Sequence, residues 1–338
     1  MSSKRLGGFK VLKDVMRISL LFSGDRDHFP SGFFQVIAEE KINLPFATSI
    51  HDNHGWGFNI LFDGADGKKI SRLIENAFDK KSTSSQKSVI LSIFPHKKNP
   101  EITGALFEAL GQEGIEIDAL ANSPSAISVV LKEDALNSAS NALFGPFSFS
   151  AYRTPTDWKL AQKGKEKLYK EVVASYQEQQ PKVYGLEYQD GQELLQVKFN
   201  NRHIGRFGAS FKEFARLGLR LTFLATGPCE ESQKEKVVFC LPALEKKSHA
   251  RLLEGIASGS NRSATAPVAT FSMNGPHFGD RHSIIYELLT SFEKSGVDLL
   301  GLSCTIASIT GAVPSPHLKT AIQAIQACFD VPTVIEKT

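Results

Sequence analysis

The hydrophobic pattern changes its period several times between Val89 and Tyr152. Residues 89–94 form a short apolar run, which is typical of a buried strand. Beyond the polar loop 96–100, apolar residues recur at the three- and four-residue spacing of one helix face, and Gly114 is well placed to end that helix. The stripe consists of Ile102, Ala105, Leu106, Ala109 and Leu110. This pattern predicts a strand followed by an amphipathic helix.

Two more strands, a second helix and a last short strand follow. A strand begins at Ile115, and after the turn 122–125 another apolar run covers 127–131. A second helical stripe lies within 136–143, and a short strand near 147–152 ends the unit. The order βαββαβ is that of the ferredoxin-like split βαβ fold, in which both helices pack on one face of an antiparallel sheet.

The same pattern recurs along the chain, so we predict an α+β protein made of four ferredoxin-like βαββαβ units. We call them units one to four and expect two tandem pairs, each unit with its own sheet, joined by a solvated helical linker. The predicted ranges are 1–85 for unit one, 86–154 for unit two, 155–181 for the linker, 182–262 for unit three and 263–338 for unit four. Unit three is the weakest copy: it begins near Leu194 after a hairpin-like turn at 188–191, and we expect its second helix around 252–256.

Three segments of unit two carry a resemblance to a known family. They are Asn-Pro-Glu-Ile-Thr-Gly-Ala-Leu-Phe-Glu-Ala-Leu at 99–110, Gly-Ile-Glu-Ile-Asp at 114–118 and Ser-Ala-Ile-Ser-Val-Val-Leu at 125–131. Together they resemble an ACT domain, in particular the regulatory ACT domains of aspartokinases. Glu101 stands where that family usually has glycine.

The resemblance implies a site for a small effector, commonly an amino acid, in the crevice between paired ACT units. In unit two it implies ligand-binding roles for Asn99, Glu101, Asp118, Asn122 and Ser123, with Asp118 at the position that binds the ammonium group. In unit four the implied residues are Gly275, His277, Phe278, Gly279, Asp280, Ser303 and Thr305. The alternative interpretation is that these side chains form turns and cap helices.

Composition excludes several classes of protein. The chain is 41% hydrophobic and 22% charged, as in ordinary globular proteins, and its net charge of +3 gives no reason to expect nucleic-acid binding. The four cysteines have no paired spacing that would indicate a zinc site or a disulfide framework. No apolar run is long enough for a membrane span and the first residues lack a signal-type apolar core, so we expect a cytoplasmic protein.

Motifs of catalysis are missing, and one pair of histidines allows a different hypothesis. We find no phosphate-binding loop, no nucleophile elbow and no kinase-like segment, so catalysis is the least favoured function. His51-Asp52-Asn53-His54 places two imidazoles beside a carboxylate and could hold a metal, although it also fits a polar hairpin loop. We expect no metal and no cofactor.

The leading hypothesis is a non-catalytic regulatory protein that binds an amino acid or similar metabolite between ACT-like units and transmits this to a partner. The partner would be a regulated enzyme or regulator, and we expect a homo-oligomer, specifically a homodimer. The alternative is a ligand-free interaction subunit that docks on a biosynthetic enzyme or a transcription regulator.

Overall fold

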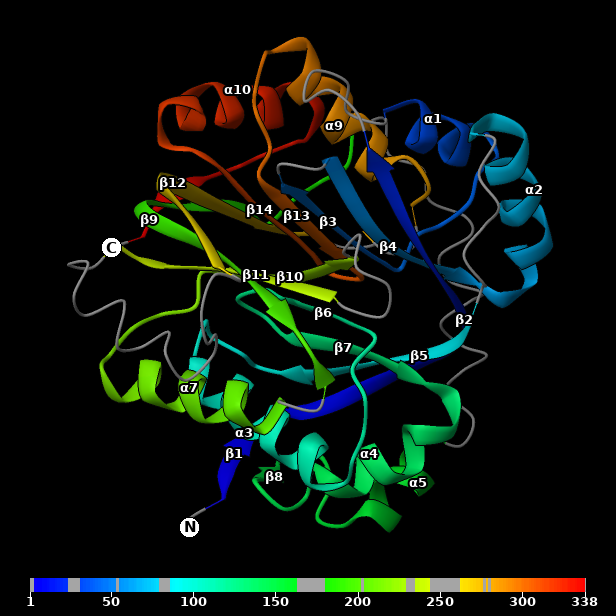
Figure 1. The fold of residues 1–338 in the computed structure, drawn as a ribbon, viewed down its shortest axis with the longest axis vertical. Helices are drawn as coiled ribbons and strands as arrows, with labels where there is room; N and C mark the ends of the chain where they lie inside the picture. The colour runs from blue at the N-terminus through cyan, green and yellow to red at the C-terminus, as the bar shows by residue number, and fades with distance from the viewer. Residues whose placement is uncertain are drawn as a thin grey trace.

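The computed structural model describes residues 3–23, 31–52, 55–78, 86–162, 180–201, 204–228, 235–243, 262–275, 278 and 281–337. These residues form four layers (Figure 1). Helices cover the two outer faces, and the strands between them form two sheet layers that pack against each other.

The first half of the chain contains every element predicted between Val89 and Tyr152, within a few residues. Its elements are β1 (Lys4–Leu6), β2 (Gly8–Ser23), α1 (Ser31–Glu39), β3 (Phe46–Asp52), β4 (Gly55–Asp63), α2 (Gly67–Phe78), β5 (Gln86–Phe94), α3 (Pro100–Gln112), β6 (Ala119–Asn122), β7 (Ile127–Lys132), α4 (Leu136–Ala142), β8 (Phe147–Phe149) and α5 (Pro155–Gln162).

A similar order of elements recurs in the second half. It comprises β9 (Gly185–Phe199), α7 (Ile204–Arg216), β10 (Phe223–Pro228), β11 (Glu235–Pro242), β12 (Arg262–Asn274), α9 (Ile284–Lys294), β13 (Gly301–Thr305), β14 (Ser308–Pro314), α10 (Leu318–Cys328) and β15 (Val334–Glu336). The predicted second helix of unit three, around 252–256, lies outside the described residues.

The strands do not form a separate sheet for each unit. Hydrogen bonding runs in the order β11-β10-β6-β7-β5-β2-β4-β3-β13-β14-β12-β9, and β9 pairs again with β11, so the path closes on itself. Long strands carry it from one layer to the other: residues 8–12 of β2 pair with β5 alone, residues 15–17 pair with both β5 and β4, and residues 18–23 pair with β4 alone. Shared pairing satisfies strand edges that separate sheets would leave open.

Two lateral contacts join the halves of the chain. β6 pairs with β10 through Ala121 and Ala225, and β3 pairs with β13 from Phe46–Thr305 to Ile50–Gly301. Unit two therefore meets unit three, and unit one meets unit four. The expected tandem pairs, one with two and three with four, account for only part of this arrangement. Units within a pair share long strands, whereas the two lateral contacts join a unit of one pair to a unit of the other.

Apolar residues fill three levels of the structure. One core lies between the α3–α7 side and its sheet and includes Phe107 and Phe211; the opposite core includes Phe34 and Phe292. Smaller clusters, with Phe46 and others, lie between the two sheet layers. Strands buried on both faces carry nearly continuous apolar runs, which explains the run at 127–131.

One local prediction is wrong. The hairpin-like turn at 188–191 lies inside the continuous strand β9, where Gly191 has φ +68° and the pairing with β12 shifts register. The start of the predicted linker is the helix α5, in which Trp158 is buried and stacks on Phe9 with 4.8 Å between ring centroids; residues 163–179 lie outside the described residues. Among the described helices, none has the length and hydrophobicity needed to cross a membrane.

Candidate functional site

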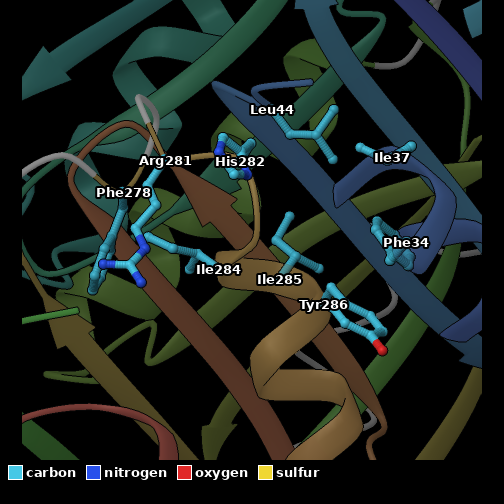
Figure 2. A pocket seen from close by; sticks show the side chains of 9 residues that line it. All are labelled: Phe34, Ile37, Leu44, Phe278, Arg281, His282, Ile284, Ile285 and Tyr286. Carbon is cyan, nitrogen blue, oxygen red and sulfur yellow. The ribbon is translucent and has the colours of Figure 1, made fainter. Parts of the chain in front are cut away.

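A hollow lies where unit one meets unit four. It is small and partly open to solvent. The lining side chains are Phe34 and Ile37 of α1, Leu44 before β3, Phe278, Arg281 and His282 of the loop before α9, and Ile284, Ile285 and Tyr286 of α9. In Figure 2, Phe278 and Arg281 lie on one side of the hollow, and Leu44, Ile37 and Phe34 on the other. Segments from both ends of the chain therefore form its walls.

The polar side chains of the hollow are cationic or neutral. Nδ1 of His282 is buried and has no hydrogen-bond partner among the described residues. Burial lowers the pKa of His282, and the charges of Lys41 and Arg281 lower it further, so the ring is neutral at pH 7. Arg281 lies 3.7 Å from Glu287, which also accepts a hydrogen bond from Ser283. The polar end of the hollow thus combines a neutral imidazole with a guanidinium that is paired with a carboxylate.

Loop length distinguishes this junction from the junction of units two and three. The loop between β12 and α9 covers nine residues, 275–283, whereas the corresponding loop between β5 and α3 covers five, 95–99. In the shorter loop the backbone carbonyl of Lys98 accepts a hydrogen bond of 3.0 Å from Leu221 N, so backbone contact closes the crevice there.

Glycines bring the helices of units two and three into close contact. A Cβ at Gly104 of α3 would lie 2.6 Å from the carbonyl oxygen of Gly208 in α7, and one at Gly111 would lie 2.7 Å from Ile204 Cγ2. At this separation there is no room for a ligand between the two helices. The junction of units one and four therefore has a hollow between its helices, whereas the topologically similar junction of units two and three has none between α3 and α7.

The predicted residues at the start of α3 act in local structure. Asn99 caps the helix, because its Oδ1 accepts a 2.9 Å hydrogen bond from Glu101 N. Glu101 forms an ion pair with Lys4. For Asn99 this agrees with the alternative interpretation, in which the side chain caps a helix. A ligand-binding role stays a prediction for Asn99 and for Glu101.

The other predicted residues of unit two surround β6. Asn122 is fully buried at the junction, where Nδ2 donates to Leu221 O at 3.0 Å. Ser123 bonds Ser125 Oγ at 2.8 Å and holds the turn to β7. Asp118 Oδ2 is buried without a hydrogen-bond partner among the described residues, and burial raises the pKa of this carboxyl against the opposing charge of Arg17.

In unit four, one predicted residue lines the hollow. Phe278 is 1% exposed and packs on Phe329. A Cβ at Gly275 would lie 2.6 Å from the Phe278 ring, so glycine leaves space for that ring. His277, Gly279 and Asp280 lie outside the described residues.

Ser303 and Thr305 lie on β13 and are not among the lining residues. Ser303 is buried and donates to Thr310 O at 3.5 Å, and Thr305 bonds Ser308 O at 3.2 Å across the turn to β14. The structure therefore does not bring the predicted residues of unit two and those of unit four together in one site. Their role as ligand contacts stays a prediction.

Sequence reasoning missed Arg281 and His282 as lining residues, although both stand in the loop compared with the aspartokinase pattern. The signal in the sequence was the nine-residue loop 275–283, which carries a cation and an imidazole close to the start of a helix. Leu44 and α1 could not be assigned to the same site, because their contact with unit four depends on the β3–β13 pairing.

A polar network between the sheet layers was also missed. Arg17 Nη1 donates to Asn59 Oδ1 at 3.1 Å and to Asp118 O at 2.9 Å, and lies 3.4 Å from Glu235 Oε1. Burial raises the pKa of Glu235 to about 7, although Arg17 opposes this. The network links units one, two and three.

The metal hypothesis gains no support from His51. Its ring stacks on Trp56 at 4.6 Å between centroids, and His54 lies outside the described residues. Across the part of the chain that the structure describes, no group of three histidines, cysteines or acids is placed to hold a metal.

No family model and no curated protein matches the chain. Among solved structures, aspartate kinase from Synechocystis matches with a TM-score of 0.77 at 15% identity, covering 96% of this chain and 56% of the other. The chain thus spans a little over half the length of that protein. The match to the ligand-free regulatory subunit of aspartate kinase from Thermus thermophilus has a TM-score of 0.38 at 18% identity and covers 42% of this chain and 99% of that subunit. The match to E. coli aspartokinase III in complex with aspartate and ADP has a TM-score of 0.34 at 15% identity and covers 45% of this chain and 34% of that protein. The predicted resemblance to aspartokinases is confirmed at the level of fold: the chain has the fold of a little over half of an aspartate kinase chain.

Proposed function

We propose that this chain is a non-catalytic regulatory protein of four ACT-like units, which binds an amino acid or similar small metabolite where unit one meets unit four. The observation that carries the proposal is the hollow between α1 and α9. The aspartate kinase fold supports the assignment to ACT-like units.

Binding can be transmitted because the walls belong to distant parts of the chain. A ligand there would contact α1 of unit one and α9 of unit four, and α9 in turn bonds α10 through Ser291 Oγ and Ala324 O at 2.8 Å. A ligand that favours one spacing of α1 and α9 would change the surface of both units. This is allosteric only to the extent that the ligand binds one arrangement more tightly.

A thermal-shift screen of the twenty amino acids at millimolar concentration tests the proposal. A ligand at tenfold excess over its Kd stabilises the protein by about 1.4 kcal/mol, which raises the melting temperature by a few degrees. Leu44→Phe, which places a larger side chain in the hollow, should abolish the shift, and Leu217→Phe, at an exposed position directly after α7, should retain it. Failure of every amino acid to stabilise the wild-type chain would contradict the proposal.

A second candidate function is a ligand-free interaction subunit. The observation in its favour is a group of exposed apolar side chains, 38–72% exposed, at one end of the β14-β12-β9-β15 strands: Tyr184, Ile306, Val334 and Ile335. Exposed apolar groups of this kind mark interaction surfaces. Light scattering of the wild type and of Ile335→Lys tests this candidate: loss of an oligomer in the variant, with no small-molecule binding in either protein, would favour it over the first.

A further inference from the structure

We infer that the outer edge of β15 is a docking surface for a second copy of this chain, whose own β15 pairs with it antiparallel and continues the sheet layer across a two-fold axis. This inference does not depend on a metabolite between α1 and α9. It gives the expected homodimer a specific interface and the exposed side chains of Val334 and Ile335 a specific partner.

One edge of β15 has no neighbouring strand in the described part of the chain. β15 stands last in the strand order and pairs only with β9, in parallel, from Val334–Leu186 to Glu336–Tyr188. Figure 1 marks the C-terminus close to β9 at the border of the sheet. All residues of β15 are exposed to solvent. An edge of this kind is a template on which another strand can add.

Two hydrogen bonds show which backbone groups of this segment point toward β9. Leu186 N donates to Thr333 O at 2.9 Å, and Lys337 N donates to Tyr188 O at 2.8 Å. Backbone N–H and C=O groups change direction from one residue of a strand to the next. Ile335, midway between the two bonded residues, therefore also faces β9.

The other residues of β15, Val334 and Glu336, direct their backbone N–H and C=O groups outward. None of these groups has a hydrogen-bond partner within the described residues. In an antiparallel pair, residues that exchange two hydrogen bonds alternate with residues that exchange none. Val334 placed opposite Glu336 of the second copy forms a bonded pair, and the two-fold axis repeats it. This register satisfies every outward backbone group of β15 in both copies.

The sequence of β15 disfavours the other registers. If Val334 stood opposite Val334 of the second copy, Glu336 would meet Pro332, which has no N–H to donate. If Glu336 stood opposite Glu336, two like charges would face each other. A slip by a single residue would set outward groups against groups that already bond β9. Hydrogen bonding and charge thus agree on Val334 opposite Glu336.

This register also brings exposed apolar side chains together. Ile335 is 43% exposed and would face Ile335 of the second copy across the axis, while Val334, 38% exposed, would lie against the aliphatic part of Glu336. Residues that share no hydrogen bond are the closest in an antiparallel pair, so the two isoleucines would be in contact. The strand is short, and we therefore expect a weak dimer whose population rises with concentration.

The charges beside this edge already have partners within each copy. Lys337 Nζ lies 3.4 Å from Glu187 Oε1, and Glu336 Oε2 accepts a hydrogen bond of 3.3 Å from the Tyr188 hydroxyl. Pairing of the two β15 strands therefore leaves no unpaired charge opposite an apolar side chain.

Cysteine cross-linking of the full chain tests the register. The Cα atoms of two residues at position 335 would lie about 4.5 Å apart, within the range of about 4.4–6.8 Å that a disulfide spans. Oxidised Ile335→Cys should form at least about tenfold more covalent dimer than Val334→Cys, which would face Glu336 instead. Leu160→Cys, at an exposed position on α5, is the matched control, and the wild type gives the background of its native cysteines.

Sedimentation velocity between about 1 µM and 1 mM protein tests the dimer itself. Val334→Pro removes an outward N–H without removing a bond to β9, and it should weaken association at least about tenfold, as should Ile335→Lys. Leu217→Lys, at an exposed position directly after α7, should change it by less than about twofold. Circular dichroism verifies that each variant is folded.

The wild type should dimerise as its concentration rises, with or without amino acids. A monomer at every concentration would overturn the inference, as would a dimer that neither Val334→Pro nor Ile335→Lys weakens. Cross-linking of Val334→Cys or Leu160→Cys equal to that of Ile335→Cys would overturn it too. These outcomes leave metabolite binding between α1 and α9 unaffected, because thermal shift tests that proposal separately.

Discussion

Gly104 and Gly208 face each other where α3 crosses α7. A Cβ at Gly104 would lie 2.6 Å from the Gly208 carbonyl oxygen, and a Cβ at Gly208 would lie 2.9 Å from the Gly104 carbonyl oxygen. Because glycine has no side chain, the backbones of the two helices can approach each other closely at this point. This contact brings units two and three together and accounts for the absence of space between their helices.

Gly104→Ala should destabilise the protein by about 2 kcal/mol or more, since the added methyl group cannot be accommodated without separating the helices. Gly205→Ala is the matched control on α7, because its Cβ meets nothing within 4 Å. It should leave stability unchanged or raise it by less than about 1 kcal/mol. Urea unfolding of both variants measures the difference. Equal stability of the two variants would contradict the close contact.

Asn201 pairs with the backbone of unit two in the manner of a peptide group. Its Oδ1 accepts from Ile117 N at 2.8 Å, and its Nδ2 donates to Ile117 O at 3.1 Å. Asn201→Ala should therefore cost about 2 kcal/mol of unfolding free energy, the sum of two hydrogen bonds. Gln35→Ala, which removes an exposed side-chain bond to Glu39, should cost less than about 0.5 kcal/mol in the same urea measurement. A cost for Asn201→Ala no larger than that of Gln35→Ala would exclude the pairing.

Glu235 should make stability fall as pH rises. The pKa of Glu235 is raised from 4.5 to about 7 in the folded state, so the folded state binds the proton more tightly than the unfolded chain does. Its contribution is present below about pH 4.5 and is lost as pH rises through about 7. The difference in unfolding free energy between wild type and Glu235→Gln should therefore decrease by roughly 2–3 kcal/mol over that interval. A difference independent of pH would show that Glu235 is not held in its acid form by burial.

His96 should have the opposite effect. Burial lowers the pKa of His96 from 6.5 to about 4, and Nε2 lies 2.9 Å from Thr103 Oγ1. The folded state excludes the charged imidazole, so this contribution is present above about pH 6.5 and is lost as pH falls through about 4. Stability measured relative to His96→Gln should decrease by roughly 3 kcal/mol on acidification. The opposite slope would mean that the imidazole is charged in the folded protein.

The sequence predicted elements whose pattern is local. The helix through Ile102 and Leu110 and the strand 127–131 follow from apolar spacing over a few residues, and the structure contains both as α3 and β7. The prediction of a turn at 188–191 is wrong because it relied on the local pattern alone. Asp190-Gly191 is a common hairpin signal, yet here pairing with β12 keeps the strand continuous.

The arrangement of units could not be derived from local pattern. The pairing of residues 8–12 with β5 and the β3–β13 contact join residues far apart in the chain. For the same reason Phe278 could be identified through a resemblance, whereas its neighbours across the hollow, Leu44 and Phe34, could not. Gly104 lies within the predicted helix, but its role depends on the backbone of α7, which is distant in the chain.

Hydrogen–deuterium exchange with and without a saturating concentration of the amino acid that gives the largest thermal shift tests most directly whether a metabolite binds between α1 and α9. The account predicts slower exchange in 31–45 and 281–290, and unchanged exchange in 98–118 and 204–221. Leu44→Phe should remove that protection. Protection confined to 98–118 and 204–221, or no protection anywhere in the presence of any amino acid, would contradict it.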